Sequence, residues 1–352
     1  MRLLVHKPGM LTTVQDLGRW GHQSRGVSVS GAMDPFSLRL GNVLLGNGEG
    51  AAALELTVMG PELEVLEGGT LILAGGDLKM RLDGIPAEPW RVYRVSRGCR
   101  ISFGGLGSGG CRANLCLAGG VEVPSVMGSR STHLRARLGG FQGRALAAGD
   151  EIVSGSPDPL WARGEGLPCP EDLRPRWDPL APLEVLEGPQ TDAFTPQGLE
   201  TFFGNEYAIS PEADRMGYRF EGPAVEHLAG ADIVSDAIPL GAIQVPGHGQ
   251  PIAMLADRQT TGGYTKIGVL SAWSVAQLAQ RLPGQGVRFR RTTPEEATAV
   301  LRDFEERLRR AGSLRASWRS RQETPSLQGE GPRRFRLRLE GREYDVQVSP
   351  GA

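Results

Sequence analysis

The stretch ELEVLEGGTLILAGG, residues 62–76, consists of short apolar runs that end at paired glycines. Short runs of this kind, bounded by glycine or proline, predict strands that end in turns. The same pattern recurs as RVYRVSRGCRISFGG (91–105), ANLCLAGGVEVPSV (113–126) and IPLGAIQVPGHGQPIAMLA (238–256), in a chain with 50 glycines and 25 prolines. The fold class that the sequence predicts is therefore mostly β with a few helices.

The expected helices have well-marked starts. Asp34 and Thr195 each precede a proline, which matches an N-cap followed by proline at the first helical position. Residues 293–296 (TPEE) form a capping box ahead of an amphipathic pattern, and residues 271–284 (SAWSVAQLAQRLPG) predict a further helix.

The chain also repeats itself at a nearly constant distance. LEVLEG occurs at residues 63–68 and again at 183–188, an offset of 120 residues. GGVEVP (119–124) is matched by GAIQVP (241–246) at offset 122, and GGF (139–141) by GGY (262–264) at offset 123. A small drift in one direction is typical of two copies of one unit. We therefore predict two related β-barrel units, residues 1–155 and 180–312, divided by a proline-rich stretch.

The C-terminal end has a different composition. Residues 313–334 are polar and predict a linker, whereas FRLRLEGREYDVQV (335–348) alternates apolar and polar residues on both sides of a Glu-Gly pair. The alternation predicts a terminal β-hairpin within residues 335–352. A lone hairpin is marginally stable, so it must dock on the body, pair with another chain or be partly disordered.

Composition excludes several function classes. The 352-residue chain has a net charge of −1, which gives no bulk electrostatic reason to bind nucleic acid or an anionic membrane. Its first ten residues lack a signal-peptide core and no run reaches transmembrane length, so we expect a cytoplasmic protein. The four cysteines form no C-x-x-C pair and the five histidines no H-x-x-x-H spacing, which predicts inert buried thiols and no metal site.

The sequence gives no support for a dinucleotide-binding motif, a P-loop or a biotin attachment site. GLGSGG (105–110) has dinucleotide-binding spacing, but a strand pattern follows it, so we expect a hairpin turn. No G-K-[ST] sequence is present, which excludes a P-loop in this chain. Lys79-Met80 lacks the preceding methionine of a biotin attachment site, so we expect no covalent biotin on this chain.

Ionisable residues gather on an irregular stretch near the N-terminus. TTVQDLGRWGHQSRGVSVSGAMDP (12–35) fits neither a helix nor a strand and carries Asp16, Arg19 and Asp34 among its glycines. Turn-rich polar backbone on a rigid scaffold is where sites tend to lie. A solvated surface loop is the alternative.

Two later stretches carry polar groups that could act together. SPEADRMGYRFEGP (210–223) contains Arg215, and ADRQTTGGYTKIG (256–268) contains Asp257 and Lys266, one of only three lysines. A Gly-Gly turn with free N–H groups beside a lysine could hold a carboxylate or a developing oxyanion. A hydrogen-bonded turn with an exposed Lys266 is the alternative.

These stretches resemble a known family. Residues 12–47, 52–65, 117–136, 185–194, 214–223 and 241–268 resemble, in order, the KipA family. That family includes the C subunit of 5-oxoprolinase, is also called allophanate hydrolase subunit 2, and is similar to half of the carboxyltransferase domain of urea carboxylase. Thr265, where the family usually has proline, is one departure.

The resemblance implies two cyclophilin-like β-barrel units and a role within a multisubunit enzyme. Family members work with a KipI-like B subunit and a LamB/YcsF-like A subunit to open 5-oxo-L-proline to L-glutamate at the expense of ATP. Since no P-loop is present, we expect ATP to bind largely to a partner. The alternatives are a biotin-dependent carboxyltransferase component with a separate carrier, and a KipA-type protein that sequesters a KipI-like kinase inhibitor. Homo-oligomerisation stays open.

The resemblance also assigns roles to residues in one shared cleft. Lys266 and Arg215 would bind the lactam oxygen or the substrate carboxylate, and Asp257 or Asp34 would orient a water or a donor. The expected substrate-binding set is Gln244, Gln259, Thr260, Thr261, Gly262, Gly263, Arg19 and Arg130.

Overall fold

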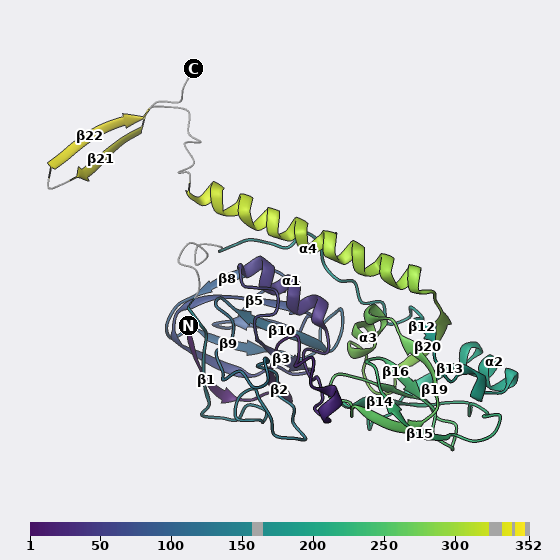
Figure 1. The fold of residues 1–352 in the computed structure, drawn as a ribbon. Coiled ribbons are helices and arrows are strands. Elements are labelled where there is room, and N and C mark those ends of the chain that lie inside the picture. Colours follow the sequence, from purple (N-terminus) through teal and green to yellow (C-terminus); the bar gives the residue numbers. More distant parts are fainter. Residues whose placement is uncertain (157–164, 324–332, 340–341, 349–352) are drawn as a thin grey trace.

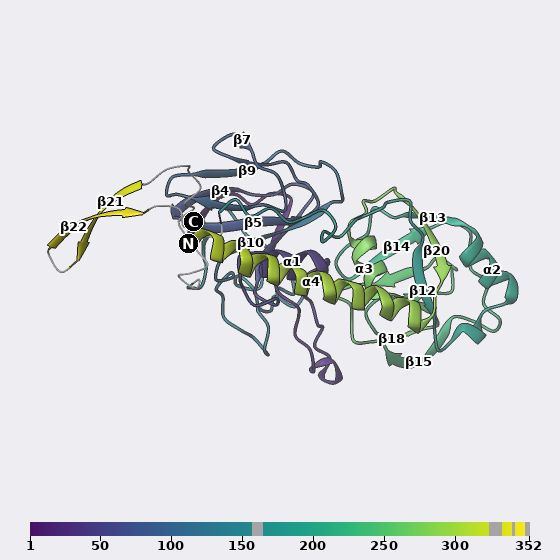
Figure 2. The same cartoon turned by 90° about the horizontal axis from the view of Figure 1, so that it is seen from above.

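The computed structural model describes residues 1–156, 165–323, 333–339 and 342–348, with side chains as far as residue 318. Two β-rich units lie side by side, and one long helix, α4 (Pro294–Glu323), lies across both (Figures 1 and 2). Within the helices of this described part, none combines the length and the apolar character that a membrane span requires.

The N-terminal unit is built from two antiparallel sheets that enclose one core. The core includes Leu3, Leu73 and Leu115. The six-stranded sheet has the order β11 (Glu151–Val153), β1 (Arg2–Lys7), β4 (Glu62–Glu67), β9 (Arg100–Phe103), β6 (Met80–Leu82) and β7 (Ile85–Pro86). The five-stranded sheet has the order β2 (Leu11–Gln15), β3 (Ala53–Thr57), β10 (Arg112–Leu117), β5 (Gly69–Gly75) and β8 (Val92–Val95).

Helix α1 (Pro35–Leu45) covers the outer face of the five-stranded sheet. Its apolar side chains share a core with Ile72, Cys116 and the α4 residue Phe304. Gly41 permits the close approach, because a Cβ at that position would lie 2.8 Å from the Cβ of Ala74. Helix α1 is therefore held between the sheet and α4.

The C-terminal unit contains a closed seven-stranded barrel. Its order is β12 (Leu183–Glu187), β19 (Lys266–Leu270), β16 (Ala242–Gln244), β17 (Ile252–Met254), β14 (Gly217–Glu221), β13 (Glu206–Ile209) and β20 (Gly286–Arg291). Stacked and edge-to-face rings of Phe202, Phe220 and Phe289 fill its core. A two-stranded ribbon, β15 (Asp232–Ala237) with β18 (Thr261–Tyr264), stands beside the barrel.

The predicted fold class and helix starts are confirmed. Asp34 accepts a hydrogen bond from the Ser37 amide at the start of α1, and Gly46 ends that helix at φ 82°. Helix α2 (Pro196–Gly204) is capped by Thr195 and α3 (Ala272–Ala279) by Ser271. The described part of the chain also has two short 3₁₀ helices, η1 (Gln23–Arg25) and η3 (Thr191–Ala193).

Several local predictions are wrong. Residues 313–323 of the predicted linker continue α4, because the first proline after the helix start is Pro325 and Leu314 and Trp318 pack on the core. GLGSGG joins β9 to β10, which belong to different sheets, so it is no hairpin turn. Both copies of the LEVLEG repeat form strands, β4 and β12. The GGF copy of the third repeat lies in a turn, however, whereas its GGY copy lies in β18.

Two further differences concern the first unit and the irregular stretch near the N-terminus. The closed barrel predicted for each half is found in the second half, whereas the described strands of the first half form two facing sheets. The stretch 12–35, predicted to contain neither helix nor strand, starts with a strand, because its first four residues belong to β2.

The C-terminal end contains two paired strands, the first of which begins two residues before the predicted segment. Strand β21 (Arg333–Leu339) pairs antiparallel with β22 (Arg342–Val348), and Leu339 lies opposite Arg342. Residues 340–341 and 349–352 of the predicted segment lie outside the described residues.

The cysteines are free thiols, three of them buried. Burial raises the pKa of Cys99 to about 11 and that of Cys169 to about 12, so both thiols stay protonated at neutral pH. In the described part of the chain no group of three or more His, Cys, Asp or Glu side chains could hold a metal ion.

Candidate functional site at the seam of the two units

The irregular N-terminal segment meets the C-terminal unit directly. The amide of Ser30 donates to the carbonyl of Ala256 at 3.0 Å, and the hydroxyl of Ser28 donates to the carbonyl of Arg258 at 2.7 Å. The N-terminal segment and the ADRQTT segment are therefore in direct contact at the seam between the units.

Arg215 and Asp257 form the centre of a buried charge network at this seam. The guanidinium of Arg215 donates to both carboxylate oxygens of Asp257, at 3.0 and 3.2 Å, and also to Glu55 of the other unit. Its Nη2, one of the two nitrogens that contact Asp257, also donates to the carbonyl of Gly31 at 2.7 Å. All three nitrogens of Arg215 are thus engaged. We therefore assign Arg215 and Asp257 to holding the two units together, and not to contact with a substrate.

Arg19 and Arg130 lie in the N-terminal unit around Asp16. The Asp16 carboxylate accepts hydrogen bonds from Ser129, Ser131 and two backbone amides. The wholly buried Arg19 donates to the carbonyl of Ser131, whereas Arg130 is exposed and donates to the carbonyl of Val123. The side chain of Arg19 therefore ties the N-terminal segment to Ser131, whereas Arg130 reaches that segment only through its backbone amide, which donates to Asp16.

Asp34 is a structural cap in a fully buried position. Its carboxylate accepts from the Ser37 amide at 3.0 Å and from the side-chain amide of Gln280 at 2.8 Å. Burial raises the pKa of Asp34 to about 6, and the nearby charge of Glu55 acts in the same direction. Asp34 therefore titrates near neutral pH while it links α1 to α3.

The raised pKa of Asp34 predicts a pH-dependent stability. Because the folded state holds this proton more tightly than the unfolded state, stability falls as pH rises from about 4 to about 6. A shift of about two pKa units corresponds to about 3 kcal/mol. Asp34→Asn keeps a capping oxygen and removes the titration, so its stability relative to wild type should rise by about that amount between pH 4 and pH 7. Urea unfolding across this range measures it.

Asp150→Asn is the control of opposite sign. The guanidinium of Arg144 holds the pKa of Asp150 below its usual value, so the stability that Asp150 contributes is present above the unfolded-state pKa and is lost on acidification. A pH-independent difference between Asp34→Asn and wild type would contradict the raised pKa.

Lys266 lies in the barrel and not at the seam. The alternative in which it is an exposed lysine on a turn is wrong. Lys266 is the first residue of strand β19 and only 1 % exposed, and its Nζ lies 2.9 Å from the carboxylate of Asp236. The preceding Gly262 and Gly263 form no turn either, because they pair with β15 as part of the extended strand β18. This strand pairing places a half-exposed Asp236 over a buried ammonium.

Gln244 lies next to Lys266. The two residues are register partners on the neighbouring strands β16 and β19. Gln244 is 3 % exposed, and its side-chain nitrogen has no hydrogen-bond partner among the described residues. Gly262 leaves room for it, since a Cβ there would lie 2.8 Å from that nitrogen. A buried ammonium and an unsatisfied amide donor are the groups that would stabilise a carbonyl oxygen or carboxylate.

Gln259, Thr260 and Thr261 of the predicted substrate-binding set come directly before Gly262, at the start of strand β18. Gln259 and Thr261 are exposed, and Thr260 is half-buried. The carbonyl of Thr260 accepts from the amide of Ile238, which ties this segment to the ribbon. The structure therefore separates the predicted residues into a seam cluster around Arg215 and a barrel cluster around Lys266.

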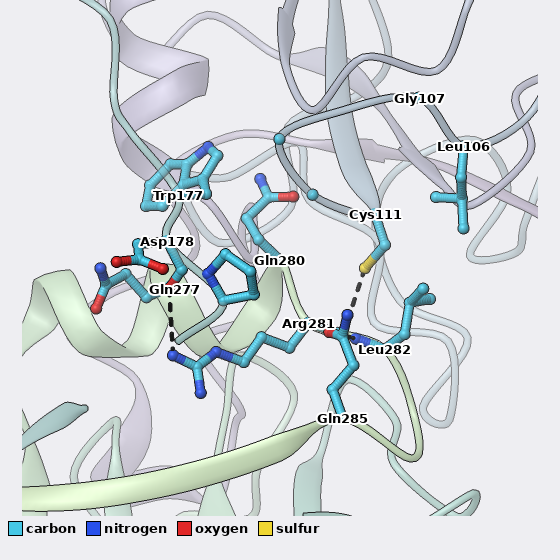
Figure 3. Close-up of a pocket in the computed structure, with 13 residues that line it drawn as sticks. Leu106, Gly107, Cys111, Trp177, Asp178, Gln277, Gln280, Arg281, Leu282 and Gln285 are labelled. Atoms are coloured by element: carbon cyan, nitrogen blue, oxygen red, sulfur yellow. Dashed lines mark hydrogen bonds between the residues drawn. The ribbon is translucent and has the colours of Figure 1, made fainter. Parts of the chain in front are cut away.

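A third location, shown in Figure 3, is a cavity of about 200 Å³ between the units. Gln280 and Arg281 line it from the end of α3, and Trp177 and Asp178 line it from the connecting segment. The guanidinium of Arg281 donates to the backbone carbonyl of Asp178 at 3.4 Å (Figure 3). The backbone carbonyl of Arg281 accepts from the Cys111 thiol at 3.5 Å. None of the predicted site residues lines this cavity.

Comparison with known proteins decides the family. The family model "Carboxyltransferase domain, subdomain A and B" matches residues 25–291. The chain is 36% identical over 293 residues to the C subunit of 5-oxoprolinase from Haemophilus influenzae, covering 83% of this chain and 92% of that protein. This chain belongs to the family of 5-oxoprolinase C subunits. The Escherichia coli member is 33% identical over 86% of this chain and 94% of its own length.

The same family fold occurs within larger proteins. The crystal structure of the K. lactis urea amidolyase matches with a TM-score of 0.82 at 29% identity, over 88% of this chain and 20% of that one. The structure of TTHA0988 matches with a TM-score of 0.74 at 34% identity, over 82% of this chain and 55% of that one. The fold of this family is therefore that of one part of the urea amidolyase chain.

Sequence reasoning missed the partners of the predicted residues. Glu55 and Asp236 complete the ion pairs of Arg215 and Lys266, and each comes from a segment that carries no chemical motif. Arg258 and Ser30 lie inside the two segments that the sequence singled out, but only their burial in the structure distinguishes them from neighbouring polar residues.

Proposed function

We propose that this chain is the C subunit of a multisubunit, ATP-dependent 5-oxoprolinase that opens 5-oxo-L-proline to L-glutamate. Its partners would be a KipI-like B subunit and a LamB/YcsF-like A subunit. The observation that carries the proposal is the extent of the match. The alignments cover 92% and 94% of two proteins named as the C subunit of 5-oxoprolinase, but only 16% of the urea amidolyase of Lachancea kluyveri.

The barrel cluster supplies groups for this reaction. Water adds across the lactam C–N bond, so that the carbonyl carbon becomes a carboxylate carbon and the nitrogen leaves as the amine after taking a proton. Negative charge develops on the lactam oxygen as the oxygen nucleophile adds to the carbonyl carbon, before the C–N bond breaks. Lys266 and the unsatisfied amide of Gln244 would donate to that oxygen. ATP would bind to a partner, since the sequence contains no P-loop.

Reconstitution tests this proposal. The purified chain is mixed with its KipI-like and LamB/YcsF-like partners, and glutamate release from 5-oxo-L-proline is followed with and without ATP. Glutamate should form only when all three proteins and ATP are present. An absence of turnover across several ratios of correctly folded proteins would count against the assignment.

A biotin-dependent carboxyltransferase component is the second candidate. The family model and the TM-score of 0.82 with urea amidolyase favour it. It requires a separate biotin carrier and a carboxyl acceptor such as urea. Addition of avidin separates the two candidates, because avidin would abolish carboxyl transfer and leave ATP-dependent opening of 5-oxo-L-proline unchanged.

A further inference from the structure

A small, partly open cavity lies at the seam, and none of its lining residues belongs to the Lys266 cluster. It measures about 90 Å³ and is lined by residues of the N-terminal segment between Leu17 and Pro35 and by Arg258 of the ADRQTT segment. Most of its wall is apolar, and the apolar side chains come from both units: Val29, Met33, Leu240, Ala256, Ala272 and Val275. Apolar walls with a few polar groups are typical of small-molecule sites.

Arg258 brings an unbalanced positive charge to this cavity. It is 5 % exposed, and its guanidinium donates to two neutral carbonyls, those of Ile238 at 3.0 Å and Leu255 at 3.2 Å. Within the described residues no carboxylate forms an ion pair with it, in contrast to Arg215 and its two acidic partners. Burial lowers the pKa of Arg258 to about 10, so it is still a cation at neutral pH. A buried charge without a counter-charge is costly, and a bound anion would remove that cost.

Ser30 provides the second polar group. Its hydroxyl is buried and has no hydrogen-bond partner among the described residues. The backbone of Ser30 has φ 57°, in the left-handed region that a serine rarely adopts. The hydrogen bond from its backbone N–H to the carbonyl of Ala256 holds that conformation. Strained backbone and unsatisfied buried hydroxyls occur together where a site is prepared for a ligand.

We propose that this cavity binds the carboxylate of a small organic acid, with Arg258 as the counter-charge, Ser30 as a donor and the apolar walls around the rest of the molecule. At about 30 Å³ per water the volume of about 90 Å³ holds about three water-sized groups, which suits a carboxylate and the carbon next to it. That the acid is 5-oxo-L-proline rests on the proposed function, and this cavity would then bind a molecule other than the one whose lactam oxygen meets Lys266.

Calorimetric binding to the isolated full chain tests the inference with three probes. 5-Oxo-L-proline carries a carboxylate and a lactam, cyclopentanecarboxylate carries only the carboxylate, and 2-pyrrolidinone carries only the lactam. The two acids should bind at least about tenfold more tightly than 2-pyrrolidinone, because a charge-assisted hydrogen bond is lost with the carboxylate.

Variants locate the binding. Arg258→Gln should weaken the binding of both acids by about 10- to 100-fold, and Ser30→Ala should weaken it by a smaller factor. Arg281→Gln is the matched control, because Arg281 is equally buried but lines the separate cavity of Figure 3. It should leave binding unchanged. If Arg258→Gln does not fold, the probe series on wild type still decides, and no preference for the acids would overturn the inference.

The outcomes separate this inference from the proposed function. Binding of cyclopentanecarboxylate that depends on Arg258, with no binding of 5-oxo-L-proline, would support the acid site and show that 5-oxo-L-proline is not its acid. Equal affinity of wild type and Arg258→Gln for the acids would overturn the site. Turnover of 5-oxo-L-proline in the assembled complex would then still stand as support for the proposed function.

Discussion

Lys266→Met should lower the turnover of 5-oxo-L-proline by the assembled complex by about 10²-fold or more. Removal of one donor to a developing oxyanion typically has an effect of this size. Methionine is the appropriate replacement because Lys266 is 1 % exposed, and alanine would leave a cavity in the barrel wall in addition to removing the charge. Steady-state glutamate release measures the effect, and it should lie in kcat rather than in KM.

Two further variants make the Lys266 result specific. Lys79→Met removes an exposed lysine of the N-terminal unit and should leave turnover unchanged. Lys266→Arg restores the charge but should rescue poorly, since a planar guanidinium does not replace a compact ammonium in a closed position. Wild-type turnover in Lys266→Met, with the complex intact, would show that the Lys266–Asp236 pair is only structural.

The parts of the fold that the sequence predicts well are those set by local contacts. Asp34 and Thr195 each accept a hydrogen bond from an amide three residues further along the chain, so residue type and spacing are sufficient to place α1 and α2. The strands are also recognisable because their apolar runs end at glycines. In both cases the interaction that decides the structure lies within a few residues.

The environment of the candidate site depends on contacts between distant segments. The sequence predicts Lys266 beside a Gly-Gly turn, but ribbon pairing between β15 and β18 extends those glycines, and Asp236, 30 residues away, covers the ammonium. Arg215 meets Glu55, which is 160 residues away, across the seam. Neither partner can be identified from local spacing. The sequence therefore locates the reactive segments but cannot show which side chains are already paired.

The division into two clusters leads to the second large effect, which is on stability. Arg215→Met should lower the free energy of unfolding by about 3–5 kcal/mol, because it leaves the buried Asp257 without an ion-pair partner among the described residues and Glu55 with only the more distant Arg112, at 3.9 Å. Urea unfolding at pH 7 measures the loss. Asp257→Asn in the Arg215→Met background should recover part of it, since the unpaired charge of Asp257 is then removed.

Arg288→Met is the matched control for the seam network. Arg288 forms an ion pair with Glu206 at 3.1 Å, but both side chains are more than half exposed, so the loss should stay below about 1 kcal/mol. An equally small loss for Arg215→Met would mean that water or a mobile neighbour replaces the guanidinium, and the seam would then be open enough for Arg215 to meet a substrate. A large loss would support a role for Arg215 in positioning the N-terminal segment, and with it Ser30, against the ADRQTT segment.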